Sequence, residues 1–154
     1  MLREEKIAEL LLRIGAVTVR PSKPFRYASG ILSPIYTDNR LLMSYPEERR
    51  KVVRAMAKLM KEKSIEADVI AGTATAGIPH AAWLSELLDK PMVYVRSEKK
   101  SHGKENVIEG IVKQGQIAVT VEDLISTGGS ALRTIQALRN AGCTANNCLA
   151  IFTY

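Results

Sequence analysis

Hydrophobic residues recur at two different spacings along the chain, and these spacings predict its helices and strands. From Glu5 to Ile14 the apolar positions follow one face of a helix. Residues 16–40 are less regular, and two extended pieces fit there, at 25–29 and 34–38. A second helix is expected to begin within Ser44–Glu47 (Ser-Tyr-Pro-Glu), because this segment has the spacing of a capping box and a proline in the first turn.

Short apolar segments alternate with helical patterns in the rest of the chain. The expected strands are residues 67–71, 91–96, 117–122 and 148–152, and the expected helices are residues 78–88 and 130–140. Strands that alternate with helices at this spacing favour βαβ units and a parallel sheet, which means an α/β fold. Neither an internal repeat nor a linker divides the sequence, so we expect one domain over residues 1–154.

The composition is that of a globular protein with a positive charge. Apolar residues make up 46% and charged residues 25% of the chain, which excludes a disordered or collagen-like protein. Lys and Arg number 22 against 16 acidic residues, so the partners that fit are nucleic acid, anionic lipid or a phosphorylated metabolite. The outer face of the second helix is basic, a pattern that favours a solvated helix surface over a nucleic-acid patch. Its basic residues are Arg49, Arg50, Lys51, Arg54, Lys58, Lys61 and Lys63.

Several features indicate a cytoplasmic protein. No apolar run approaches the ~18 residues that span a bilayer. The N-terminal segment is charged and unlike a secretory signal. Cys143 and Cys148 are the only cysteines, so a reduced chain is the simplest interpretation. His80 and His102 are the only histidines, which leaves few ligands for a metal site.

The sharpest chemical signal lies in residues 119–130. An apolar strand ends in Glu122 and Asp123, a turn of hydroxyls and glycines follows, and a helix then begins. Backbone N–H groups at such a turn suit a phosphate, and the absence of Gly-Lys-Ser/Thr shows that it is not a Walker A loop. Two acids would repel a bare phosphate, but they can accept hydrogen bonds from sugar hydroxyls or help to hold Mg²⁺. The alternative is a capped turn in which the acids are incidental.

Two further segments are compatible with a phosphorylated ligand. Residues 96–105 contain four basic residues, two acids and His102, so this loop can close on a polyanion, although a solvated surface loop has the same composition. Residues 71–79 join a strand to a helix through small side chains. They permit close approach of a diphosphate to the backbone, or simply tight packing of the helix on the sheet.

These segments together resemble a known family. Glu122–Ser130 resembles the phosphoribosyl diphosphate (PRPP) signature of type I phosphoribosyltransferases. Phe25–Arg40 is similar to the N-terminal hood of orotate phosphoribosyltransferases, and Arg96–Gly103 is similar to their mobile catalytic loop. Three motifs in the expected order along nearly the whole chain are far more specific than any one of them.

The resemblance implies a fold, a reaction and an assembly. The fold is that of type I phosphoribosyltransferases, a mostly parallel sheet flanked by helices, with a small hood from about residues 1–40 and a core from about 41–154. The reaction is transfer of the phosphoribosyl group from PRPP to orotate, in pyrimidine biosynthesis. Mg²⁺ is the implied cofactor, carried by PRPP rather than by protein side chains. A homodimer with shared active sites is implied, without a membrane and with nucleic acid as an unexpected partner.

The resemblance also assigns roles to individual residues. Lys100, His102 and Asp123 are the implied catalytic residues, with Lys100 and His102 supplied by the neighbouring subunit. The residues implied to bind PRPP are Arg96, Lys100, His102, Glu122, Asp123, Leu124, Ile125, Ser126, Thr127, Gly128, Gly129 and Ser130. Those implied to bind orotate are Ser126, Ser29, Gly30 and Tyr36, although Tyr36 also fits a strand aromatic packed in the core.

The sequence departs from the family in a few places. Ala28, Ala76 and Ser97 stand where relatives carry a lysine, so no side-chain charge is assigned there. The sequence ends at Tyr154 after an apolar strand, whereas relatives continue, so we expect a short C-terminal part, as a natural shortening or a fragment. Two other functions stay open: phosphoribosyl transfer to a different base, which the hood disfavours, and a PRPP-binding nucleic-acid regulator, which the complete catalytic loop disfavours.

Overall fold

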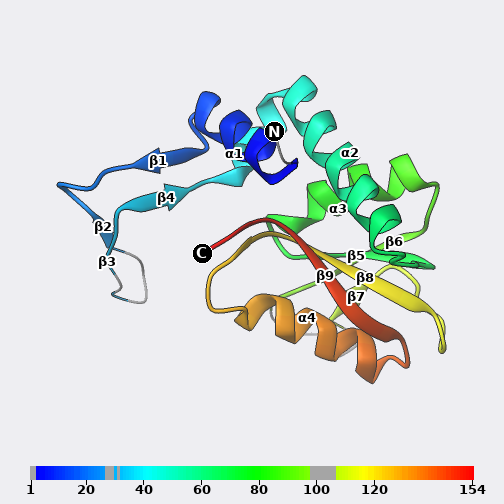
Figure 1. Cartoon of the computed structure of the whole chain (residues 1–154). Helices are drawn as coiled ribbons and strands as arrows, with labels where there is room; N and C mark the ends of the chain where they lie inside the picture. The colour runs from blue at the N-terminus through cyan, green and yellow to red at the C-terminus, as the bar shows by residue number, and fades with distance from the viewer. Residues whose placement is uncertain (1–2, 27–29, 31, 98–106) are drawn as a thin grey trace. The chain divides into compact units, whose positions relative to one another are not determined.

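The computed structural model describes residues 3–26, 30, 32–97 and 107–154. The chain forms two compact units, residues 1–52 and 53–154, and the second helix crosses the boundary between them. Figure 1 shows the elements of both units along the chain.

The first unit consists of one helix, two small antiparallel ladders and a 3₁₀ helix. Its elements are α1 (Arg3–Arg13), β1 (Val17–Val19), β2 (Phe25–Arg26), β3 (Leu32–Ser33), β4 (Ile35–Thr37), η1 (Asn39–Ser44) and the start of α2 (Pro46–Glu62). Strand β1 pairs with β4, and β2 pairs with β3, both antiparallel. The helix expected from Glu5 is confirmed as α1, which buries Leu10 and Leu11. The two extended pieces are confirmed in β2 and β4, and residues 27–29 lie outside the described part.

The start of α2 differs by one residue from the capping-box expectation. Ser44 is the last residue of η1, and the helix begins at Pro46. The carbonyl oxygen of Tyr45 accepts a hydrogen bond of 2.9 Å from the Arg49 N–H, so Tyr45, and not Ser44, occupies the N-cap position. Proline determines this start, because its fixed φ and missing N–H suit the first helical position.

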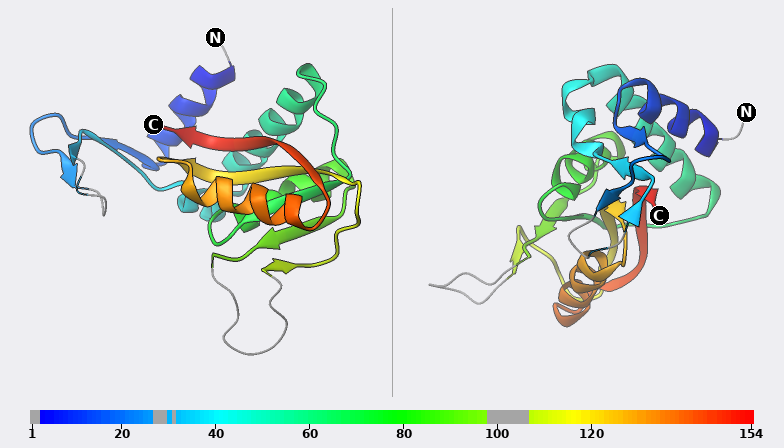
Figure 2. Two further views of the ribbon diagram at one scale, coloured as in Figure 1. Left: turned by 90° about the horizontal axis from the view of Figure 1, so that it is seen from below. Right: turned by 90° about the vertical axis from the view of Figure 1, so that its left-hand side faces the viewer.

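The second unit is built around a five-stranded sheet. Its elements are β5 (Val69–Thr73), α3 (Gly77–Leu88), β6 (Met92–Val95), β7 (Ile108–Glu109), β8 (Ile117–Ile125), α4 (Gly129–Asn140) and β9 (Thr144–Thr153). The strand order is β7-β6-β5-β8-β9 (Figure 2). Strands β6, β5, β8 and β9 are parallel, and β7 is antiparallel to β6. The predicted α/β fold with a mainly parallel sheet is therefore confirmed.

Side chains of the central strands alternate between two cores. On one face α3 and the later turns of α2 cover the sheet, and that core includes Ile70, Val119 and Val121. On the other face α4 covers the sheet, and that core includes Ala71 and Ala118. Burial on both faces explains why β5 and β8 read as continuous apolar runs in the sequence.

Strand β8 is longer than predicted, which changes the place of the two acids. It continues to Ile125, because its ladder with β9 extends as far as the Ile125–Thr153 pair. Glu122 and Asp123 therefore lie inside the strand and not at its end. Strand β7 was not expected, since two residues at the end of a polar segment carry no period that distinguishes a strand.

The outer face of α2 is exposed and basic, as predicted. Two of its lysines form ion pairs, Lys51 with Glu48 at 3.8 Å and Lys58 with Glu62 at 3.7 Å. No helix in the described ranges is long and apolar enough to cross a membrane. Both cysteines are free thiols, Cys143 buried and Cys148 half-buried.

Candidate active site

Three loops of the second unit leave the same edge of the sheet. They follow β5, β6 and β8 and begin at Ala74, Arg96 and Ser126. These three strands are parallel neighbours, with β5 in the middle, so their carboxyl ends lie side by side. The Ala74 N–H donates to the carbonyl oxygen of Val95 at 2.9 Å, which ties two of the loops together at their bases. Ligands of open α/β sheets bind at this edge.

Glu122 is a buried carboxylate inside β8, next to the start of α4. Its side chain is only 4% exposed. Ser130 Oγ donates to its Oε2 at 2.9 Å, and the Asp123 backbone N–H donates to its Oε1 at 3.2 Å. Burial raises the pKa of Glu122 to about 7, opposed by the hydrogen bond from Ser130 and reinforced by the neighbouring carboxyl of Asp123. At neutral pH the ionised form of Glu122 therefore depends on the hydrogen bonds that Ser130 and Asp123 donate to it.

Asp123 has a different environment from its neighbour. Successive side chains of a strand point to opposite faces of the sheet, so Asp123 does not share the α4-covered face with Glu122. Asp123 is half-buried, whereas Glu122 is buried. Of the two predicted acids, Asp123 is thus the more exposed one in the free chain.

The turn after β8 leads directly into α4. Gly128 has φ +82° and forms the N-cap without a side-chain hydrogen bond, a conformation that glycine adopts at no steric cost. Its carbonyl oxygen accepts from the Leu132 N–H at 2.9 Å, which begins the helix. Ser126 and Thr127 before it are exposed. The N–H groups of the first turn of a helix lack intrahelical partners, so this end of α4 suits an anion.

The loop after β5 is held close to β8 by a glycine. Gly77 opens α3, and a Cβ placed on it would lie 2.5 Å from the carbonyl oxygen of Val121 and 3.4 Å from Cα of Glu122. A Cβ on Gly72 would lie 3.0 Å from that of Ala81. Tight helix–sheet packing, one of the two interpretations of these small residues, is thus confirmed. The N-cap of α3 is Ala76, without a side-chain hydrogen bond, and the Ala74–Thr75 peptide bond is cis.

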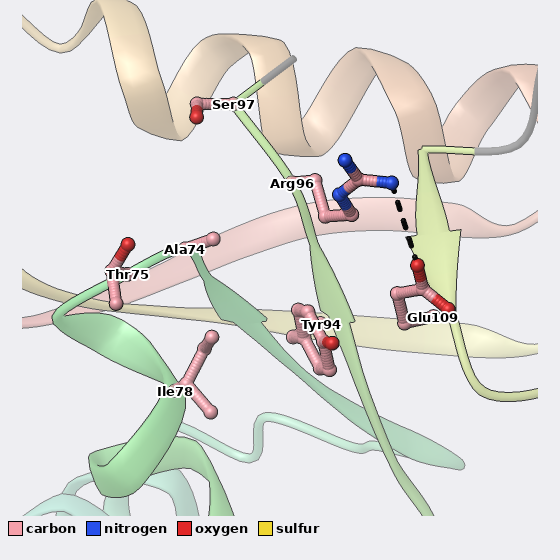
Figure 3. Close-up of a pocket in the computed structure, with 7 residues that line it drawn as sticks. All are labelled: Ala74, Thr75, Ile78, Tyr94, Arg96, Ser97 and Glu109. Carbon is pink, nitrogen blue, oxygen red and sulfur yellow. Dashed lines mark ion pairs between the residues drawn. The ribbon is translucent and has the colours of Figure 1, made fainter. Parts of the chain in front are cut away.

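An open pocket of about 530 Å³ lies at this edge (Figure 3). It is lined by Ala74, Thr75, Ile78, Tyr94, Arg96, Ser97 and Glu109. Arg96 points toward Glu109, and its Nη1 lies 3.6 Å from Oε1 of that carboxylate (Figure 3). About a quarter of the Arg96 side chain is exposed. The pocket therefore presents a cation beside the loop that follows β5.

The structure brings together one part of the predicted site within the second unit, and other predicted site residues belong to the first unit. Arg96 and the segment Glu122–Ser130 lie at one edge of the sheet in the second unit. Gly30 and Tyr36 belong to the first unit. Gly30 has φ +85°, and Tyr36 is 41% exposed with its ring centroid 5.3 Å from that of Phe25, so Tyr36 is not a core residue. Ser29, Lys100 and His102 lie outside the described residues.

Two pocket residues, Tyr94 and Glu109, were missed by the sequence analysis. They face each other across the β6–β7 ladder, with Tyr94 paired to Glu109. The sequence pattern placed Tyr94 in a strand and indicated no function for it. Glu109 lies near the end of a polar segment. An acid directly before Gly110, a residue typical of turns, was too weak a signal to find it.

The sheet and the glycine turn that follows Glu122 and Asp123 belong to a domain of the phosphoribosyltransferase class. The family model of the phosphoribosyl transferase domain matches residues 42–153. Within this class the chain belongs to the orotate phosphoribosyltransferase family. It is 56% identical to the orotate phosphoribosyltransferase of Coxiella burnetii over 97% of this chain and 71% of that one. It is also 56% identical to the Listeria innocua orotate phosphoribosyltransferase over 98% of this chain and 72% of that one.

Solved structures agree with this assignment. Orotate phosphoribosyltransferase from Aeropyrum pernix superimposes with a TM-score of 0.81 at 28% identity and covers 96% of this chain and 93% of that one. Leishmania donovani UMP synthase gives a TM-score of 0.79 at 29% identity, over 96% of this chain and 36% of that one. The predicted family and fold are confirmed.

Proposed function

We propose that the chain transfers the phosphoribosyl group of PRPP to orotate, giving orotidine 5′-monophosphate and diphosphate. The observation that carries the proposal is the half-buried Asp123 on β8, the strand that leads into the turn before α4 and packs against Gly77 at the start of α3. This geometry supports a pentose held by its hydroxyls, with a phosphate at the α4 end and a diphosphate at the other. The relatives named above carry the same activity in their names.

The chemistry is a displacement at the anomeric carbon of the ribose. The bond from this carbon to the diphosphate oxygen breaks, the diphosphate leaves with the electron pair, and a ring nitrogen of orotate forms the new bond. Positive charge develops on the ribose and negative charge on the leaving group, so the protein acts electrostatically. Arg96, Lys100 and His102 neutralise the diphosphate, Asp123 orients the ribose, and no covalent nucleophile is involved.

The turn from Leu124 to Ser130 binds the 5′-phosphate through backbone N–H groups and hydroxyls. Mg²⁺ prefers oxygen ligands, and the half-buried carboxylate of Asp123 is compatible with a metal that arrives on PRPP. The bound ion would supply charge neutralisation of the leaving diphosphate. Arg96 already provides one positive charge in the pocket after β5, beside Glu109.

Orotate selection and assembly complete the proposal. Ser29, Gly30 and Tyr36 of the hood, together with Ser126, bind orotate, and the hood and core work as one phosphoribosyltransferase domain over residues 1–154. Two copies form a dimer in which Lys100 and His102 of one chain serve the site of the other. The compartment is the cytoplasm, in keeping with the free thiols of Cys143 and Cys148.

A single assay tests this function. Purified chain is mixed with orotate, PRPP and Mg²⁺, and the loss of orotate absorbance is followed together with release of diphosphate. Adenine, guanine, hypoxanthine and uracil in place of orotate serve as controls for the base. Turnover with orotate alone supports the proposal, whereas turnover with a different base, or PRPP binding without any turnover, would overturn it.

A second candidate function is nucleic-acid binding by the exposed basic face of α2. Residues 46–63 contain seven basic and three acidic residues, so they contribute four of the six net positive charges of the chain. Titration of labelled duplex DNA and RNA at several salt concentrations tests it, with Arg50→Glu and Arg54→Glu as variants. Affinity that falls steeply with salt and is lost in both variants would support it; affinity equal in variants and wild type would exclude this face.

A further inference from the structure

The carboxylate of Glu122 links strand β8 to the start of α4. One oxygen accepts the Ser130 hydroxyl at 2.9 Å, and the other accepts the Asp123 backbone N–H at 3.2 Å. The Glu122 side chain is 4% exposed, so neither oxygen has ready access to bulk water. Loss of either donor would leave one oxygen of a buried carboxylate without a hydrogen bond, which is costly.

A second acceptor would compete for the proton that the Ser130 hydroxyl donates to Glu122. Ser130 belongs to the turn to which the proposed function assigns the 5′-phosphate, and a phosphate is an acceptor of hydrogen bonds. A serine hydroxyl has a single proton to donate. The Ser130 hydroxyl therefore cannot donate to Glu122 and to a bound phosphate at the same time.

We propose that the 5′-phosphate takes the Ser130 hydroxyl away from Glu122, and that a ribose hydroxyl then replaces it as the donor to Glu122. The inference rests on the proposed function and deepens it. In the free chain Glu122 is a positioning residue that holds the start of α4, and in the complex it becomes a ligand of the pentose. The exchange makes the binding of the phosphate and of the pentose interdependent.

The exchange also accounts for specificity. Inorganic phosphate removes the donor of Glu122 and offers no replacement, so the buried carboxylate opposes it. A pentose 5-phosphate supplies the missing donor and compensates the carboxylate. The site is thereby biased toward phosphorylated sugars over the phosphate ion, which is abundant in any cell.

The surroundings of Glu122 support a strong dependence on this donor. Burial raises the pKa of Glu122 to about 7, and the Ser130 hydrogen bond acts in the opposite direction. On the neighbouring strand β9, burial and the charge of Glu122 together raise the pKa of Cys148 to about 11, so this thiol stays protonated and adds no charge. Asp123 is the other titratable group in contact, and its carboxyl raises the Glu122 pKa.

Two double-mutant cycles separate the exchange from simple charge repulsion. The first combines Glu122→Gln with Ser130→Ala, and the matched control combines Asp123→Asn with Ser130→Ala. Both cycles remove one negative charge near the phosphate, but only Glu122 contacts Ser130. Dissociation constants for inorganic phosphate and ribose 5-phosphate are measured by calorimetry at about pH 8, above the Glu122 pKa. Circular dichroism checks folding, and Ser130→Gly replaces Ser130→Ala if the latter does not fold.

The expected pattern differs in sign between the two ligands. Glu122→Gln should bind inorganic phosphate about five-fold tighter, because an amide competes less well than a carboxylate for the Ser130 proton. It should bind ribose 5-phosphate at least ~10-fold more weakly, because a charge-assisted hydrogen bond is lost. The tightening should disappear in the Ser130→Ala background, whereas the Asp123→Asn effect should be the same in both backgrounds within about two-fold.

Two results would count against the inference. Equal effects of Glu122→Gln with and without the Ser130 hydroxyl would overturn the exchange and leave only charge repulsion. Weakening of both ligands together would assign Glu122 a purely structural role. Failure of the wild-type chain to bind ribose 5-phosphate or PRPP at all would instead overturn the proposed function, so the two failures are distinguishable.

Discussion

Gly77 and Val121 approach so closely that no side chain fits between them. A Cβ on Gly77 would lie 2.5 Å from the carbonyl oxygen of Val121, and this oxygen belongs to the backbone of strand β8. The contact places the start of α3 directly against the strand that carries both acids. Two of the loops at the candidate site are thus held at a fixed separation by the absence of a single methyl group.

Replacing Gly77 by alanine should therefore destabilise the protein. The added methyl group meets rigid backbone, and overpacking of this kind costs roughly 1–3 kcal/mol. For a chain of this size we expect Tm to fall by about 2–4 °C per kcal/mol. Thermal unfolding followed by circular dichroism measures it. Gly129→Ala is the matched control, since a Cβ there meets only the end of the Arg133 side chain at 3.4 Å; equal Tm values for both variants would contradict the prediction.

Asp123→Asn should weaken PRPP binding by about ten-fold, because an amide oxygen is a weaker acceptor than a carboxylate for the ribose hydroxyls. The fold should be unaffected, since the side chain is only half-buried. Calorimetry with PRPP and Mg²⁺ gives the affinity. Asp89→Asn, at the far end of α3, is the control for loss of an acid. An unchanged PRPP affinity in Asp123→Asn would remove this residue from the ribose site.

Arg96→Ala should lower the affinity for diphosphate about ten-fold and raise the KM for PRPP. The guanidinium stands in the pocket after β5, and hydrogen bonds to charged groups are worth about 1.5–3 kcal/mol. Product inhibition by diphosphate measures the effect directly. Glu109→Gln should act in the opposite direction, because it releases Arg96 from its ion pair at 3.6 Å. Parallel changes in the two variants would show that the pair is structural only.

Lys100→Ala should reduce turnover at least ~100-fold, as expected when one donor that stabilises developing charge is lost. The prediction rests on the family resemblance, because Lys100 lies outside the described residues. The measurement is kcat at saturating PRPP and orotate. Lys90→Ala, an exposed lysine before β6, controls for charge. Wild-type turnover in Lys100→Ala would exclude this lysine from the mechanism.

The elements that the sequence predicted well are those with a strong pattern. The continuous apolar runs of β5 and β8 indicated a buried parallel sheet, and the amphipathic stripes indicated α1 and α4. The N-cap of α2 was misplaced, because both Ser44 and Pro46 are start signals and only the structure shows that proline dominates. The extent of β8 and β9 depends on their mutual ladder, a property of two segments that neither sequence carries alone.

The candidate site was predicted in composition and missed in geometry. The motif around Glu122 and Asp123 was evident, but it gave no sign that one acid is buried against Ser130 while the other stays half-buried. That difference follows from strand alternation and from the place of α4, which depend on the assembled sheet. The Arg96–Glu109 pair was missed for the same reason, since it depends on a two-residue strand.

A second buried titratable group affects how stability depends on pH. His80 is fully buried on α3, its ring centroid lies 5.3 Å from that of Trp83, and neither ring nitrogen has a hydrogen-bond partner among the described residues. Burial lowers the pKa of His80 from 6.5 to about 4. Between pH 6.5 and about pH 4, His80 therefore binds a proton in the unfolded chain but not in the folded chain. The His80 contribution to the free energy of unfolding thus falls as the pH is lowered from 6.5 to about 4.

Glu122 should have the opposite effect, and the variant Glu122→Gln isolates it. The pKa of Glu122 is raised from 4.5 to about 7, so between these values the folded chain holds a proton that the unfolded chain has released. The free energy of unfolding of the wild type, minus that of Glu122→Gln, should therefore decrease as the pH rises from 4.5 to about 7 and stay constant above it. His80 is present in both proteins, so its contribution cancels in the difference. Urea unfolding at a series of pH values measures both free energies. A difference that is constant across this range would show that Glu122 is ionised throughout, and that the donors at Ser130 and Asp123 outweigh burial.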